Sequence, residues 1–96
     1  MLKKIIKLSG SFCAPCKFYA PTFDRVSKYD EYKNIEFKTY DVEDDEGEEL
    51  SIKYNIRNVP TTLLLDENDE LLFKAIGAMQ EHELKKIIDE TMEKNG

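Results

Sequence analysis

The sequence of 96 residues has no tryptophan, few prolines and glycines, and only two cysteines. Small secreted domains that depend on disulfides contain about two to four bridges, so two cysteines exclude a disulfide scaffold. No apolar run approaches the ~18 residues of a membrane-spanning helix. Near the N-terminus, Lys7 interrupts an apolar stretch that is too short for a secretion signal. We therefore expect a soluble, cytoplasmic protein that does not bind membranes.

Positive charge is also scarce, because 14 Lys and Arg residues are opposed by 20 Asp and Glu residues, for a formal net charge of −6. Binding to nucleic acid or to anionic membranes depends on clustered Lys and Arg side chains. The charge balance therefore argues against both as main partners. Apolar residues make up 41% of the chain, enough for one modest core, and we expect a monomer with a single domain over residues 1–96.

The hydrophobic pattern predicts elements in the order βαβαββα. Expected strands cover residues 3–8, 35–42, 61–65 and 70–76, and expected helices cover residues 13–30, 41–54 and 80 onward. In the last helix the spacing places four apolar side chains on one face: Leu84, Ile87, Ile88 and Met92. Pro21 is expected to kink the first helix. One parallel crossover followed by an antiparallel hairpin predicts an α/β fold with a four-stranded mixed sheet flanked by three helices.

An acidic segment covers residues 41–49, where seven of nine residues are Asp or Glu. As a calcium loop it fails, because Gly47 occupies the seventh position from Asp41 instead of the sixth, and Ile52 stands where the loop needs Glu. Acidic side chains at the N-terminus of a helix are favoured by the helix dipole. We therefore interpret the segment as a solvated helix start, distant in sequence from the cysteines.

The two cysteines, Cys13 and Cys16, lie where a predicted strand ends and a helix begins. Unpaired N–H groups and the positive end of the dipole stabilise a thiolate there, and can lower a cysteine pKa from about 8.5 by one or more units. Cys13 at the exposed end would attack a substrate disulfide, and Cys16, one turn inward, would resolve the mixed disulfide. Pro15 stiffens the intervening turn at an early helical position.

Two other interpretations of the cysteine pair are a zinc site and an inert, packed pair. Tetrahedral zinc normally has four ligands, and His82 is the one histidine in the chain, about seventy residues away. We therefore expect no metal. The position of the pair between strand and helix favours redox chemistry over inert packing.

Three separated segments resemble the thioredoxin family. Phe12-Cys13-Ala14-Pro15-Cys16-Lys17, followed by Pro21, is similar to the family motif W-C-G-P-C-K with its later proline. Residues 54–63 resemble the segment Y-G-I-R-G-I-P-T-L, and Ile76-Gly77-Ala78 resembles V-G-A. The resemblance implies a minimal thioredoxin fold without the extra N-terminal strand and helix of longer members. It also implies a thiol–disulfide oxidoreductase that needs no cofactor beyond a redox-active Cys13–Cys16 disulfide.

The resemblance also implies roles for residues around the cysteines. Pro60 would be a cis-proline packed beside the disulfide, and the backbone of Val59 would pair with an extended substrate segment. The remaining implied substrate-binding residues would line one shallow apolar surface: Phe12, Ala14, Pro15, Gly77 and Ala78. Implied partners are a flavoprotein similar to thioredoxin reductase and proteins that contain disulfides, ribonucleotide reductase being one family precedent.

The main departure from the family pattern is Lys7, which stands where the family usually has a buried Asp six residues before the first cysteine. In one interpretation this cation stabilises thiolates and makes the pair more oxidising. In the other, its long side chain reaches solvent and affects neither cysteine.

Two alternatives to the proposed activity also stay open. One is a glutaredoxin-like protein using glutathione, although the Gly-Gly-x-x-Asp segment of that family is absent. The other is a non-catalytic binding module with the same fold.

Overall fold

The computed structural model describes residues 1–95, and these form four strands, three α-helices and a short 3₁₀ helix. The strands are β1 (Leu2–Ser9), β2 (Glu36–Asp41), β3 (Thr61–Asp66) and β4 (Leu71–Ile76). The helices are α1 (Ala14–Ser27), η1 (Asp30–Tyr32), α2 (Asp45–Lys53) and α3 (Glu81–Asn95). The order of strands and α-helices is the βαβαββα order that the sequence predicts.

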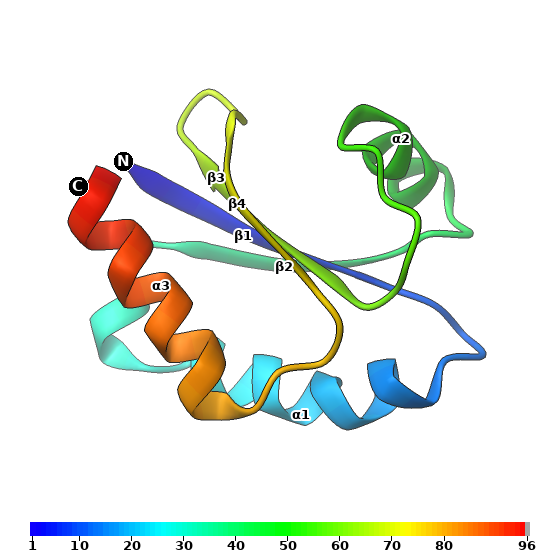
Figure 1. Ribbon diagram of the computed structural model, residues 1–96, viewed down its shortest axis with the longest axis horizontal. Coiled ribbons are helices and arrows are strands. Elements are labelled where there is room, and N and C mark those ends of the chain that lie inside the picture. The colour runs from blue at the N-terminus through cyan, green and yellow to red at the C-terminus, as the bar shows by residue number, and fades with distance from the viewer. Residues whose placement is uncertain (96) are drawn as a thin grey trace.

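The strands form one mixed sheet in the order β2-β1-β3-β4. β1 pairs with β2 in parallel, while β3 pairs with both β1 and β4 in antiparallel orientation. Figure 1 shows α1 and α3 together on one face of the sheet and α2 alone on the other. The central strands β1 and β3 are therefore covered on both faces, which explains their nearly continuous apolar sequences. This arrangement confirms the predicted α/β fold class.

Alternate residues of the central strands contribute to two apolar clusters. Ile5 of β1 packs with α1 and α3 in a cluster that includes Phe23, whereas Ile6 packs in the cluster on the α2 side of the sheet. Successive side chains of a strand point to opposite faces, so Lys7 shares the face of Ile5. Lys7 therefore lies beneath α1, the helix that begins at the cysteines.

Several boundaries differ from those predicted. α1 ends at Ser27, and the chain from Asp30 to Tyr32 forms the 3₁₀ helix instead of continuing the helix to residue 30. α2 begins at Asp45 rather than at residue 41, because the Val42 N–H donates to the Ser9 carbonyl and holds this turn beside β1. α1 continues through Pro21, and the kink expected there stays a prediction.

The predicted apolar face of α3 is wrong at one position. Leu84 and Ile88 are fully buried, and Ile87 is partly buried against the same cluster. Met92, however, is 37% exposed, while Thr91 is buried and donates its hydroxyl hydrogen to the Ile87 carbonyl. A threonine can be buried in a helix when its hydroxyl forms a hydrogen bond to a carbonyl one turn earlier. The buried face of α3 therefore includes Thr91, where the apolar pattern predicts the neighbouring Met92. Within residues 1–95, none of the helices is long and apolar enough to cross a membrane.

Candidate active site

Cys13 is the N-cap residue of α1, with an extended backbone conformation, and its Sγ accepts a hydrogen bond of 3.1 Å from the Cys16 N–H. Cys13 and Cys16 form a disulfide, with their Cα atoms 5.2 Å apart. Cys16 is 2% exposed, whereas Cys13 is half-buried. Of the two sulfur-bearing residues, Cys13 is therefore the one that a substrate reaches first. Its sulfur lies at the positive end of the helix dipole, where a thiolate is stabilised.

The Val59–Pro60 peptide bond is cis, as the family resemblance implies. The Val59 carbonyl oxygen lies 3.6 Å from Cys13 Sγ, so this segment is in contact with the disulfide. In the disulfide the sulfur carries no hydrogen, but a thiol formed at Cys13 on reduction has an acceptor at this place. The Pro60 carbonyl in turn accepts a 2.8 Å hydrogen bond from the Gly77 N–H. Three segments far apart in the sequence therefore meet at one end of the sheet.

Exposed apolar residues are neighbours of the cysteines and of Gly77 in the sequence. Phe12 is fully exposed and Ile76 is 64% exposed, and Ala14, Pro15 and Ala78 are also exposed. Gly77 adopts a φ of 97°, a conformation that glycine adopts readily. The structure thus brings Val59, Pro60 and Gly77 together beside Cys13. The phenyl group of Phe12 is exposed to solvent. Isolated exposed apolar residues need no explanation, but several beside a reactive pair indicate a surface that binds other proteins.

Sequence reasoning missed Gly10, which lies between β1 and the cysteines. A Cβ at Gly10 would lie 3.3 Å from Val59 Cγ2 and 3.9 Å from the Cβ of Cys13. The glycine therefore permits close approach of the active-site loop to the segment before Pro60. A glycine between a predicted strand and the cysteine pair is the sequence feature that points to such an approach.

The acidic segment is also closer to the cysteines than its place in the sequence suggests. Ser11 donates a 3.0 Å hydrogen bond to the Asp41 carboxylate, which links the active-site loop to the start of the acidic turn. β1 and β2 are parallel, so their carboxyl ends lie at the same edge of the sheet. The predicted parallel crossover implies that these two strand ends are neighbours, but it does not predict the hydrogen bond between Ser11 and Asp41.

Lys7 is buried, with 4% of its surface exposed. Its Nζ lies 5.1 Å from the centre of the Phe23 ring and 5.7 Å from that of Tyr19, and Lys7 forms no ion pair with other residues of the described chain. Burial lowers the pKa of Lys7, an effect that the negative charge of Asp24 partly opposes. The aromatic faces of two α1 side chains thus take the place of a bonded counter-ion.

Tyr19 joins the cysteine helix to the strand that follows Pro60. Its hydroxyl and the Thr62 hydroxyl form a buried hydrogen bond of 2.8 Å. Burial raises the pKa of Tyr19 to about 12, so the side chain is a neutral hydrogen-bonding group over the physiological range. Thr62 is also the residue of β3 that pairs with Lys7. Through these contacts α1 is fixed relative to β1 and β3.

A disulfide at the N-terminus of a helix, next to a cis-proline and an apolar surface, defines a thiol–disulfide oxidoreductase of α/β architecture. Residues 2–90 match the sequence profile of the family described as Thioredoxin. The chain belongs to the thioredoxin family. It is a protein disulfide oxidoreductase whose redox-active group is the cysteine pair, and the family implies protein disulfides as substrates and a reductase as partner.

Individual relatives support this assignment. A thioredoxin of Buchnera aphidicola is 35% identical over 89 residues, covering 92% of this chain and 78% of the relative. A thioredoxin of Mycoplasmoides gallisepticum is 30% identical over 86 residues, covering 90% and 81%. The crystal structure of the Malassezia sympodialis thioredoxin Mala s 13 superposes with a TM-score of 0.79 at 25% identity, covering 92% of this chain and 73% of that one. These similarities confirm the resemblance read from the motifs.

Thioredoxins use a redox-active disulfide without a further cofactor. Among residues 1–95, no group of three or more His, Cys, Asp and Glu side chains is placed to hold a metal ion.

Proposed function

We propose that Cys13 is the nucleophile and Cys16 the resolving thiol in the reduction of protein disulfides. The Cys13 thiolate attacks one sulfur of the substrate disulfide, forming a mixed disulfide and releasing the first substrate thiolate. The Cys16 thiolate then attacks Cys13 Sγ, which forms the Cys13–Cys16 disulfide and releases the second substrate thiolate. Two electrons pass from the cysteine pair to the substrate, and solvent supplies the protons. The observation that carries this order is the burial of Cys16 beside a more accessible Cys13.

Substrate recognition on this proposal uses the segment before Pro60. An extended substrate segment pairs with the Val59 backbone, as in recognition by strand addition. Its apolar side chains contact the surface formed by Phe12, Ala14, Pro15, Gly77 and Ala78. The contact between the Val59 carbonyl and Cys13 Sγ supports this arrangement, because a strand paired there brings its own cysteine to the nucleophile.

The electron donor on this proposal is a flavoprotein similar to thioredoxin reductase, acting in the cytoplasm, and ribonucleotide reductase is one protein class that could accept the electrons. Insulin reduction tests the donor. We expect NADPH with thioredoxin reductase to sustain turnover, and glutathione with glutathione reductase to support less than about a tenth of that rate. A higher rate with glutathione would instead establish a glutaredoxin-like protein. Dithiothreitol as the reductant provides a control that does not depend on either enzyme.

We also propose that Lys7, which lies beneath α1, alters the thiol pKa and the reduction potential of the cysteine pair. A buried cation stabilises a nearby thiolate, so Lys7→Asp should raise the pKa of the active-site thiol by about one unit. The reduction potential should fall by about 30 mV, because Asp in place of Lys7 destabilises the thiolates and therefore the reduced form. Thiol titration and a redox equilibrium with glutathione measure these two quantities.

Lys7→Met provides the matched variant, because it keeps most of the side-chain volume and removes only the charge. We expect its thiol pKa and its potential to lie between those of the wild type and of Lys7→Asp. If both folded variants titrate and equilibrate as the wild type does, Lys7 has no influence on the cysteines.

A further inference from the structure

The first two turns of α1 expose an apolar face to solvent. The buried side chains of this helix are Cys16, Tyr19, Phe23 and Val26. Six residues between positions 14 and 21 are exposed, and five of them are apolar: Ala14, Pro15, Lys17, Phe18, Ala20 and Pro21. Figure 1 shows no other helix or strand of residues 1–95 on the outer side of these turns. A surface helix normally carries polar side chains on its outer face, so this outer face of α1 departs from the usual pattern.

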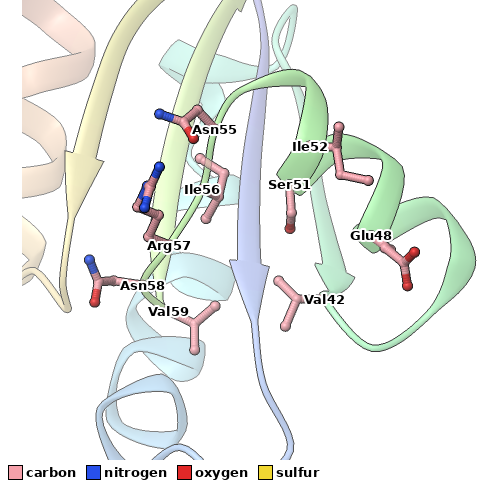
Figure 2. A pocket seen from close by; sticks show the side chains of 9 residues that line it. All are labelled: Val42, Glu48, Ser51, Ile52, Asn55, Ile56, Arg57, Asn58 and Val59. Atoms are coloured by element: carbon pink, nitrogen blue, oxygen red, sulfur yellow. The ribbon is translucent and has the colours of Figure 1, made fainter.

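The exposed side of α2 has the usual composition. Of the six exposed residues of this helix, five are Asp, Glu or Lys and the sixth is Ile52. Figure 2 shows Ile52 on α2, with Glu48 one turn away. Single exposed apolar residues are normal on a protein surface, whereas a group of them marks an interaction site. The group on α1 therefore indicates a contact surface for another molecule.

The outer face of α1 begins at the active site. Cys13 is the N-cap residue of α1, and Ala14 is the first residue of the helix. Ala14, Phe18 and Pro21 follow the i, i+4, i+7 spacing of one helix face. At about 1.5 Å per residue, Phe18 lies about 7 Å beyond Cys13 along the helix axis. A protein that covers Cys13 from this side therefore covers Phe18 as well.

Lys17 is the one charged residue among the six. Lys17 forms no ion pair within residues 1–95. Asp24, the one acidic residue of α1, accepts a 3.1 Å hydrogen bond from Lys28. All 20 Asp and Glu residues of the chain follow Phe23 in the sequence. The outer face of α1 is thus apolar with a single positive charge, and it complements an apolar surface that presents a carboxylate.

The position of this face on a helix limits the kind of partner that it binds. The backbone of a helix is hydrogen-bonded internally, so the face contacts a partner through side chains alone. Pairing at the Val59 backbone, in contrast, suits substrates of different sequence. Recognition by side chains requires a partner whose surface is constant. In the proposed cycle that partner is the electron donor, because the same protein returns at every turnover while the disulfide substrates differ.

We propose that the outer face of α1, centred on Phe18, is a docking surface for the flavoprotein reductase. Phe18 packs between apolar side chains of the reductase, and Lys17 pairs with a carboxylate at the edge of that contact. A substrate segment paired at Val59 leaves Phe18 free. This inference rests on the proposed function and adds to it a surface that recognises the electron donor.

Insulin reduction with two electron donors tests the docking surface. Each variant is assayed with NADPH and thioredoxin reductase, and again with dithiothreitol, at the same insulin concentration. Phe18→Ser should lower the ratio of the first rate to the second about five- to tenfold, because an aromatic side chain at the centre of an interface contributes much of its affinity. The loss should appear in the KM of the reductase for this protein and not in kcat. Lys17→Glu should lower the ratio about threefold, an effect that should disappear in about 0.5 M salt.

Ile52→Ser and Lys33→Glu are the matched controls. Ile52 is 74% exposed and lies on α2, across the sheet from α1. Lys33 is exposed and follows η1, and its replacement changes the net charge as Lys17→Glu does. Both controls should keep the ratio of the two rates within about twofold of the wild type. An equal loss in Phe18→Ser and Ile52→Ser overturns the inference, as does an unchanged ratio in Phe18→Ser.

Other occupants of the face give different results. If Phe18→Ser lowers both rates by the same factor, the face binds insulin and not the reductase, and the inference is wrong. Sedimentation velocity should show monomers for the wild type and for Phe18→Ser. A wild-type dimer that dissociates in Phe18→Ser would make a second copy of the chain the partner, and would likewise overturn the inference.

The wild-type rates separate this inference from the proposed function. If dithiothreitol sustains insulin reduction and NADPH with thioredoxin reductase does not, the proposed donor is wrong and the docking surface fails with it, while the assignment of Cys13 stands. If neither donor raises the rate above the blank, the assignment of Cys13 fails. If both donors sustain turnover and Phe18→Ser keeps the wild-type ratio, the docking surface alone fails.

Discussion

Replacing Cys13 with serine is expected to lower the rate of insulin reduction by at least about a thousandfold, because a serine hydroxyl is not ionised at neutral pH and cannot form a disulfide. Cys13 is the accessible member of the pair, and Cys16 is buried behind it. No other cysteine is present in the chain to substitute for it. Turbidity of the released insulin chain, with dithiothreitol as the reductant, measures the rate against a blank without protein.

Cys16→Ser is the matched control, since it also removes the disulfide and one sulfur. It too should lose turnover, but it should accumulate a mixed disulfide between Cys13 and the substrate, because the thiol that resolves this intermediate is missing. Mass spectrometry of the unreduced reaction detects the adduct. An adduct on Cys13→Ser and none on Cys16→Ser would reverse the roles of the two residues. Wild-type rates for Cys13→Ser would show that the pair is not the catalytic group.

The features that could be predicted from the sequence are those with strong local signals. A strand, a helix with an apolar stripe and two cysteines between them fix the position of Cys13 at a helix N-terminus. The alternation along β1 also places Lys7 on the face that α1 covers, since Ile5 is buried on that face. The position of Pro60 beside the cysteines was expected from the resemblance of residues 54–63 to a segment of the thioredoxin family. Each of these patterns lies within a short stretch of sequence, so it can be recognised without knowing which segments pack together.

The features that could not be predicted depend on contacts between segments far apart in the sequence. The approach of Gly10 to Val59 requires the loop after α2 to pack on the loop after β1. The hydrogen bond from Ser11 to Asp41 requires two strand ends to meet, and it makes the acidic turn a neighbour of the active site. Hydropathy reports neither contact, because both involve small or polar residues. The acidic turn therefore adjoins the active site, although it is distant from the cysteines in the sequence.

Gly47→Ala is expected to destabilise the protein by about 2–3 kcal/mol through overpacking. Alanine favours a helix over glycine by about 1 kcal/mol, so propensity alone predicts the opposite sign. However, a Cβ at Gly47 would lie 1.9 Å from the Asp41 carbonyl oxygen and 3.1 Å from the Val42 Cα. These are backbone atoms, and no change of side-chain rotamer moves them. α2 must therefore withdraw from the end of β2.

Urea denaturation of Gly47→Ala measures the loss, with Glu46→Ala as the control for helix propensity in the same turn of α2. Glu46 is exposed, and its replacement should change the free energy of unfolding by less than about 0.5 kcal/mol. Because Asp41 accepts a hydrogen bond from Ser11 and the Val42 N–H donates to the Ser9 carbonyl, withdrawal of α2 also disturbs the active-site loop. Insulin reduction by the folded fraction of Gly47→Ala should therefore fall while that of Glu46→Ala does not. An unchanged or higher midpoint for Gly47→Ala would mean that α2 does not pack on the Asp41 carbonyl, and that the acidic turn is not held beside the cysteines.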